Sequence, residues 1–226
     1  MTTSTISGAG FVLPGGILSG PQVLRSSQTL VEPGPDGDAL SGFDPKPYLQ
    51  SVKGYLDPAA KFVLAAAALA VGETREALRE RGSTVGVVTA TRWGATDSAF
   101  KFYRQLTEKG PRFASPLVFP HGYPNAAGNL LAMEFGFSGP HMVFFGPESA
   151  AEALCFASDQ LRNARATDMI VVAYEAPPDN TVPDDASPLH GAVALHLDTP
   201  PPPPVKQTPP SQKGAIQTLL TIIQDE

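Results

Sequence analysis

Residues 139–154 read GPHMVFFGPESAAEAL and contain the clearest change of local structure in the chain. The run HMVFF is short, apolar and rich in β-branched and aromatic residues, as buried strands are. Gly146 and Pro147 interrupt it, and the small and acidic residues that follow are typical of a helix N-terminus. We therefore expect a strand, a sharp turn and a helix, with one side chain projected above the sheet at the turn.

The same alternation of strands and helices extends in both directions from this segment. Asp57 and Pro58 form a good N-cap and first-turn pair for a helix that runs to about Arg81, where Gly82 can end it. Residues 59–71 are apolar nearly all round, which indicates that this part of the helix is buried. Strands are expected at 6–13, 85–90, 141–145, 169–174 and 192–197, and further helices are expected from 96 or 97, at 125–135 and from 147 or 148. Residues 14–41 are read mostly as loop. The pattern indicates an α/β domain, and its sheet should be mixed because the last strand follows without a helix.

The composition changes at Thr199, where the chain reads TPPPPPVKQTPPSQK. A segment so rich in proline cannot pack as a core element and should form a polyproline II linker. We therefore divide the chain into a domain at 1–198, a Pro-rich linker at 199–214 and a short terminal helix or tail at 215–226.

Charge and cysteine content exclude several classes of function. The 226 residues include 22 acidic and 16 basic ones, for a net charge of −6, and no basic stripe is present that would favour nucleic acid or an anionic membrane. Cys155 is the only cysteine, and no Cys/His cluster has metal spacing, so we expect no metal and no cofactor. The longest apolar stretch, 62–71, is about half a membrane span, and the N-terminus lacks the features of a secretion signal, which favours the cytoplasm.

Several segments resemble β-ketoacyl synthases, the condensing enzymes of fatty-acid and polyketide synthesis. They are ISGAGFVLPGG, FDPKPYL, VGVVTATRWGATDSAFKFYRQLTEKGP, SPLVFPHGYPNAAGNLLAMEFGFSGP and the strand, turn and helix described first. The resemblance covers 6–197 and implies the N-terminal half of a thiolase-like fold, a mixed β-sheet layered with helices. The family's C-terminal half is absent from this sequence.

The resemblance also locates the family's nucleophile. Aligned from Gly139 and Pro140, the position of the family's catalytic Cys falls on Glu148, and the two assisting histidines belong to the absent half. A carboxylate here should accept backbone N–H bonds and stabilise the helix instead of catalysing. Ser149 is expected to act as a cap, and Cys155 as a small buried side chain.

The four histidines show no paired spacing, so each is expected to be structural or on the surface, and His196 is expected to face solvent. Asn125 is read as an N-cap, and the resemblance also puts it beside the subunit interface. In the resembling family the strand before the nucleophile pairs across the dimer axis. The interface residues predicted on this basis are Pro124, Asn125, His141, Met142, Val143, Phe144 and Phe145.

Family members without the Cys include chain-length-factor subunits, and half-length ones are associated with aryl-polyene clusters. The resemblance therefore implies a non-catalytic subunit that heterodimerises with a full-length ketosynthase, and reaches acyl carrier protein through that complex, in type II polyketide, aryl-polyene-like or fatty-acid-like synthesis. An uncovered sheet face left by the absent half would also require a partner. Two alternatives remain: a malonyl-carrier decarboxylase that supplies starter units, and an adaptor whose prolines 200–204 dock on an aromatic groove.

Overall fold

Six strands form one sheet in the computed structural model, which describes residues 6–35, 37–51, 54–178, 181–184, 186–201 and 211–224. Across the sheet the order is β2-β1-β6-β5-β3-β4. The strand bounds are β1 Ile6–Leu13, β2 Gly16–Ser19, β3 Val85–Thr91, β4 His141–Phe145, β5 Asp168–Glu175 and β6 Gly191–Leu197. The edges of the sheet are therefore β2 on one side and β4 on the other.

The strand directions confirm the expected mixed sheet. β3 runs parallel to both β4 and β5, whereas β6 is antiparallel to β5 and to β1. Every residue of β3, β5 and β6 is buried, as expected for apolar runs that are covered on both faces.

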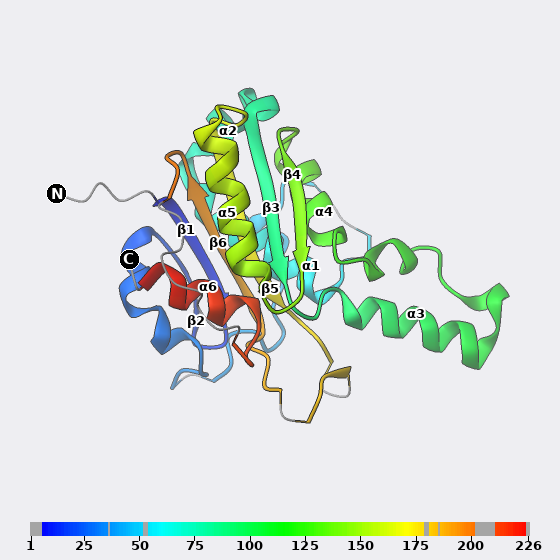
Figure 1. Cartoon of the computed structure of the whole chain (residues 1–226). Coiled ribbons are helices and arrows are strands. Elements are labelled where there is room, and N and C mark those ends of the chain that lie inside the picture. The colour runs from blue at the N-terminus through cyan, green and yellow to red at the C-terminus, as the bar shows by residue number, and fades with distance from the viewer. Residues whose placement is uncertain are drawn as a thin grey trace.

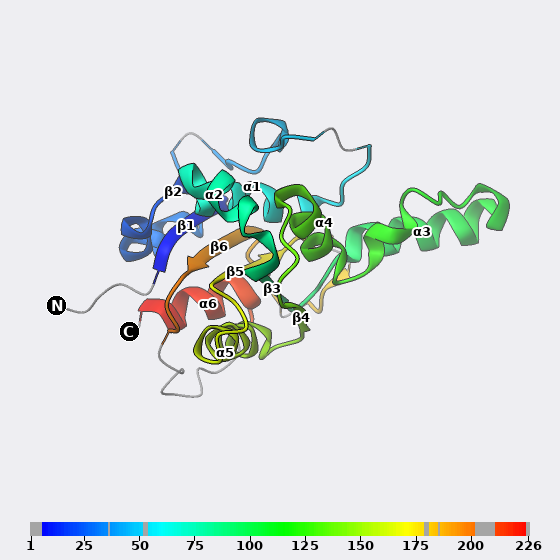
Figure 2. The same ribbon diagram turned by 90° about the horizontal axis from the view of Figure 1, so that it is seen from above.

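Helices cover both faces of the sheet, which gives three layers (Figures 1 and 2). On one face lie α1 (Pro58–Val71) and α4 (Ala126–Phe135), and on the other lie α5 (Ser149–Arg162) and α6 (Ala215–Gln224). The expectation of an uncovered sheet face is therefore wrong for the described residues.

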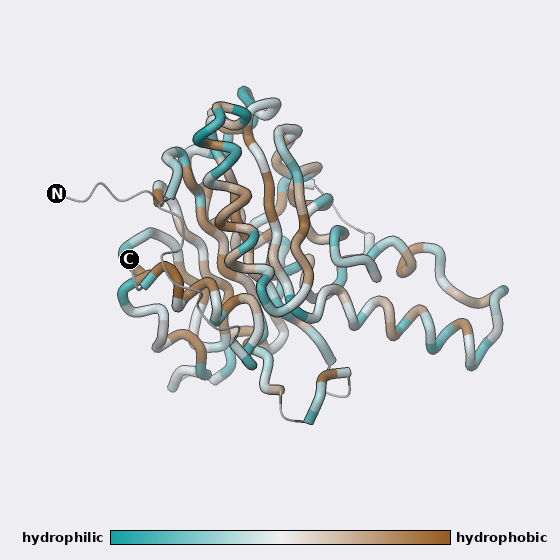
Figure 3. Tube along the Cα trace, viewed as in Figure 1, coloured by the Kyte–Doolittle hydropathy of each residue, from teal (hydrophilic) through white to brown (hydrophobic). Residues whose placement is uncertain are grey.

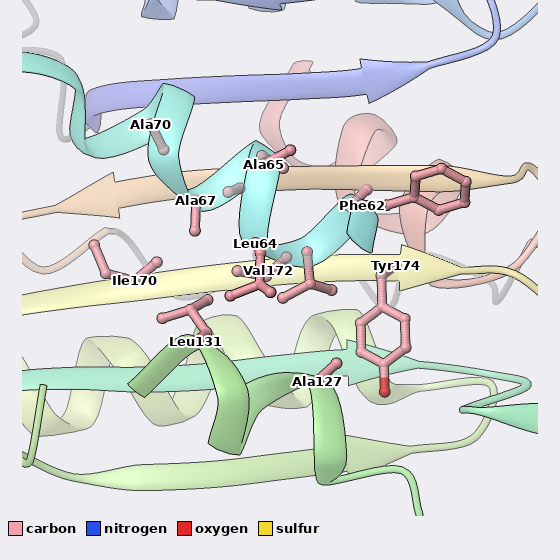
Figure 4. Close-up of a cluster of buried hydrophobic side chains, with 14 of the residues drawn as sticks. Phe62, Leu64, Ala65, Ala67, Ala70, Ala127, Leu131, Ile170, Val172 and Tyr174 are labelled. Carbon is pink, nitrogen blue, oxygen red and sulfur yellow. The ribbon is translucent and has the colours of Figure 1, made fainter. Parts of the chain in front are cut away.

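The alanine-rich helix α1 packs unusually close to β1. A Cβ added at Gly10 would lie 2.1 Å from the carbonyl oxygen of Ala66, so only glycine fits there. Figure 4 shows the cluster that results, in which Leu64 of α1, Leu131 of α4 and Val172 of β5 meet side by side. Because α1 presents small side chains to β1, the backbones of helix and strand come close together.

Two predicted boundaries differ from the structure. The helix expected to reach residue 81 ends at Val71, because Gly72 turns the chain with a φ of +47°, and a separate helix α2 (Arg75–Glu80) follows. The stretch read as loop contains β2 and a 3₁₀ helix, η1 (Pro21–Leu30). A four-residue strand shows too little alternation to be recognised from sequence. Most of the predicted linker, 202–210, lies outside the described residues.

Candidate functional site

The edge strand β4 carries five of the predicted interface residues. It pairs with β3 on one side, from Val87 opposite His141 to Thr91 opposite Phe145. No strand pairs with its other side in the described chain. Met142 is 42% exposed and Phe145 is 59% exposed, although strand interiors are normally covered. A strand edge with exposed apolar side chains is a template for pairing with another chain.

Pro124 and Asn125, the other two predicted interface residues, lie at the end of β4. A Cβ added at Gly94 would be 3.1 Å from the Phe145 ring and 3.5 Å from the Pro124 ring, so both rings border the same spot. The Pro124 carbonyl accepts a 2.7 Å hydrogen bond from the buried Tyr174 hydroxyl, which fixes this corner. Asn125 lies at the N-cap position of α4, as predicted, and is exposed, but its side chain makes no capping hydrogen bond.

Residues 96–123, here called the arm, project from the body beside this corner (Figures 1 and 2). The arm consists of α3 (Thr96–Lys109) and a returning limb with the 3₁₀ helices η5 (Pro111–Phe113) and η6 (Phe119–Gly122). Figure 3 shows hydrophobic positions recurring along it. Its exposed large apolar residues are Phe100, Tyr103, Leu106, Phe113, Leu117, Phe119 and Tyr123.

Phe100, Tyr103 and Leu106 share one face of α3, but that face does not join the core. Tyr103 is 60% exposed, and Ser98 is the only residue of α3 classed as buried. The two limbs pack mainly on each other, as in the contact of Phe102 with Phe119 at 5.0 Å between ring centroids. Periodicity shows that a helix has an apolar face, but it does not identify what covers that face.

One buried carboxylate holds the base of the arm to the body. Asp57 accepts hydrogen bonds from the Ala59 N–H (2.8 Å), the Ser98 N–H (3.0 Å) and the Ser98 hydroxyl (2.5 Å). It therefore caps α1 as predicted and also serves the first turn of α3. Burial raises the pKa of Asp57, and the hydrogen bonds from Ser98 and Ala59 oppose that shift. The arm thus leaves the body in a defined direction.

The turn between β4 and α5 forms as expected, and Gly146 has a φ of +122° there. Glu148 occupies the N-cap position of α5 and is exposed, but its side chain accepts no capping bond, which corrects the expected role. Ser149 is fully buried, and its hydroxyl has no partner among the described residues, so it is not a cap.

Cys155 is exposed, contrary to its predicted burial. Partial desolvation, together with the carboxylates of Asp159 and Glu152, raises the pKa of its thiol. A raised pKa leaves little thiolate at neutral pH. Cys155 therefore lacks the activation that a nucleophile requires.

His196 is buried, so its predicted solvent-facing position is wrong. Its ring lies 2.8 Å from Asp168, which also accepts two bonds of 3.0 Å from the Arg81 guanidinium. Burial works against ionisation of Asp168, but the hydrogen bonds from His196, Arg81 and Thr167 prevail and lower its pKa. His121 and His141 have pKa values lowered by desolvation. Alternation along β6 could not reveal His196, because that strand is covered on both faces.

Neither a metal site nor a membrane span is found in the described part of the chain. No group of three or more His, Cys, Asp or Glu side chains comes together there. The described helices are also too short or too polar to cross a bilayer.

Comparison with known proteins gives a family and a set of similar folds. Residues 36–185 match the family model described as the β-ketoacyl synthase N-terminal domain. No curated protein matches the chain. Among solved structures, it is similar to the ishigamide ketosynthase/chain length factor, with 20% identity and a TM-score of 0.65 over 91% of this chain and 64% of that one.

Two further structures share the fold at 18% identity. One is AntDE:AntF, a type II polyketide synthase acyl-carrier protein in complex with its ketosynthase bound to the hexaketide, with a TM-score of 0.64 over 86% of this chain and 62% of that one. The other is the ketosynthase ApeO in complex with its chain length factor ApeC from Xenorhabdus doucetiae, with a TM-score of 0.56 over 87% and 80%.

This chain thus spans somewhat less than two thirds of the first two structures. The thiolase-like fold expected from the sequence is confirmed. Since the matched residues make up well over half of the sequence, the chain belongs to the family of β-ketoacyl synthase N-terminal domains.

Proposed function

We propose that this chain is a non-catalytic ketosynthase-like subunit of the chain-length-factor type, which binds an active ketosynthase. The observation that carries the proposal is one continuous unpartnered surface, formed by β4, the corner at Pro124 and the arm. We call it the partner surface. The ketosynthase complexes to which the fold is similar support a partner of the same family, since two of them pair a ketosynthase with a chain length factor.

The chemistry of the partner surface fits an extended protein contact. The free edge of β4 offers main-chain groups for strand pairing, and Met142 and Phe145 offer apolar area beside them. The arm adds aromatic side chains, which dominate the energetics of many interfaces. Residues 96–113 include four basic and two acidic residues in a chain of net charge −6, so a partner with an acidic rim is favoured.

The non-catalytic part of the proposal rests on the residues near the turn after β4. Glu148 stands where the family resemblance puts the nucleophile, Ser149 is buried, and the exposed Cys155 thiol has a raised pKa. His196 is held by Asp168 and cannot reach a substrate while it is buried. Such a subunit would act on the product through its partner, by shaping the pocket for the growing acyl chain.

Co-expression with a full-length ketosynthase tests the partnership. Val143→Asp puts a charge at a partly buried position of β4 and should abolish co-purification. The matched control is Leu18→Asp on β2, the opposite edge of the sheet, where Leu18 is 44% exposed. The control should co-purify as the unmodified chain does. Equal co-purification of both variants would contradict the proposed surface.

Intact mass measurement tests the absence of catalysis. The isolated chain, incubated with acyl carrier protein loaded with malonyl or acyl groups, should gain no acyl adduct. Glu148→Cys should still make no ketide product, although its thiol lies at a helix N-terminus that lowers the pKa of a cysteine. An acyl adduct on the unmodified chain, or condensation by the variant at a rate typical of ketosynthases, would contradict a non-catalytic role.

A further inference from the structure

The C-terminal helix α6 lies beside α5 on one face of the sheet (Figures 1 and 2). Its buried apolar residues Ile216, Leu219 and Leu220 follow the spacing i, i+3, i+4, so they form one stripe. The stripe packs in a cluster with Phe11 of β1 and Val193 of β6. A helix of ten residues is marginal in water by itself, so α6 depends on this face for its structure.

A buried carboxyl group holds the N-terminus of α6. Glu175, at the end of β5, accepts a 2.9 Å hydrogen bond from the Ala215 N–H. The same carboxyl accepts bonds from the N–H groups of Arg92 (2.7 Å) and Trp93 (3.1 Å) and from the Thr91 hydroxyl (3.0 Å). Glu175 therefore joins the start of α6 to the turn that follows β3.

Gly214 permits this close approach. Its φ is +93°, and a Cβ there would lie 2.8 Å from a carboxyl oxygen of Glu175. A side chain at this position would be strained and would also push the helix away from its anchor. Both the conformation and the packing at 214 are thus adapted to the contact with Glu175.

The residues on either side of this anchor make specific contacts as well. The Lys213 carbonyl accepts a 2.8 Å bond from the Leu189 N–H, and the Ser211 carbonyl accepts a 2.9 Å bond from the Arg92 guanidinium. At the other end of α6, the Gln224 amide donates to the Leu24 carbonyl (3.1 Å) and lies 2.8 Å from the Ser27 hydroxyl. The segment is therefore bound at both ends and along its apolar stripe.

We propose that residues 211–224 act as an intramolecular ligand. The amphipathic helix α6, anchored on Glu175, binds the sheet face beside α5, and its contacts are sufficient to hold it there even when the chain between them is cut. The binding site is this face, and its ligand class is an amphipathic helix whose first N–H group, that of Ala215, donates to a buried carboxyl. The face is closed by the chain itself before any partner arrives, which leaves the partner surface free for that role. The inference goes beyond the proposed function and does not depend on it.

Cleavage of the chain between the body and α6 tests the proposal on the full-length protein. A site for a specific protease is inserted within residues 202–210, the protein is cut, and the two pieces are followed by size exclusion, mass spectrometry and thermal melting. We expect the C-terminal piece to co-elute with the body and the melting temperature to stay within a few degrees. Separate elution of the pieces, or precipitation of the body on cutting, would overturn the proposal.

Matched variants identify the contacts responsible. Leu219→Asp puts a charge in the apolar stripe and should release the piece after cutting, whereas Thr221→Asp, on the half-buried side of α6, should retain it. Glu175→Gln puts an amide NH₂ group where Glu175 has an oxygen that accepts hydrogen bonds, and should release the piece about tenfold faster. If Leu219→Asp fails to fold before cutting, Leu219→Ala replaces it. Retention by the stripe variant equal to that by Thr221→Asp would contradict the assignment. Because no ketosynthase is present, failure here is distinct from failure of the proposed partnership.

Discussion

The buried faces of the sheet and the partner surface are both apolar, but they differ in what covers them. Leu64 and Leu131 pack on strands of the same chain and are fully buried. Leu117 and Phe113, on the arm, are 72% and 66% exposed. Some apolar residues of this chain are therefore buried within its own fold, whereas those of the arm are left exposed.

The helices of the two regions show the same contrast. α1 is rich in alanine and lies against β1 at backbone distance, so small side chains are required along it. α3 has large aromatic residues separated by charged ones, and its main contact is its own returning limb. Scattered exposed apolar residues are normal on protein surfaces, but a continuous patch indicates a binding site.

Truncating one leucine in each region should give the largest difference in the free energy of unfolding. Leu64→Ala removes a fully buried side chain and should lower the free energy of unfolding by about 2–5 kcal/mol. Leu117→Ala, on the exposed arm, should change it by less than about 0.5 kcal/mol. Urea denaturation measures both. Similar losses in the two variants would show that the arm belongs to the folded core.

The sequence predicted most of the covered region and less of the exposed one. The strands at 85–90, 141–145 and 192–197 and the turn after β4 were identifiable because apolar runs and Gly-Pro punctuation are local signals. The arm could not be foreseen, since periodicity does not identify the partner of an apolar face. The burial of His196 and the role of Glu175 depend on contacts between segments far apart in the chain, which no local pattern records.

The buried carboxyl group of Glu175 predicts that the stability of the folded chain depends on pH. Burial raises its pKa from 4.5 to about 7, against the hydrogen bonds that it accepts. The folded state therefore holds the proton more tightly than the unfolded state, so the contribution to stability is complete below about pH 4.5 and is lost as the pH rises through about 7.

Between pH 5 and pH 8 the unmodified chain should thus lose stability relative to Glu175→Gln by up to about 3 kcal/mol. Denaturation of both proteins at four pH values measures the difference, with the exposed Glu108→Gln as control. A difference that does not change with pH would show that Glu175 is not titrating in this range.

The smallest expected effect concerns the joint between the two regions. Asp57→Asn weakens the bonds to Ala59 and Ser98, and should cost about 1–2 kcal/mol, the usual value of a helix cap. Hydrogen exchange should become faster at the base of α3. The matched control is Asp97→Asn in the first turn of α3, where Asp97 makes no comparable hydrogen bond. It should change neither the free energy of unfolding nor the exchange rate at the base of α3. Faster exchange in both variants would mean that charge, not the Asp57 cap, holds the arm.

Hydrogen exchange of the unmodified chain, with and without a ketosynthase, shows whether β4 and the arm bind the partner. We predict that the partner slows exchange in β4 and in the arm, residues 141–145 and 96–123, and leaves α6 unchanged. The exposed strand edge should gain hydrogen bonds in such a complex, whereas α6 is already covered within the chain. Protection confined to α5 and α6, with β4 and the arm unaffected, would contradict the account.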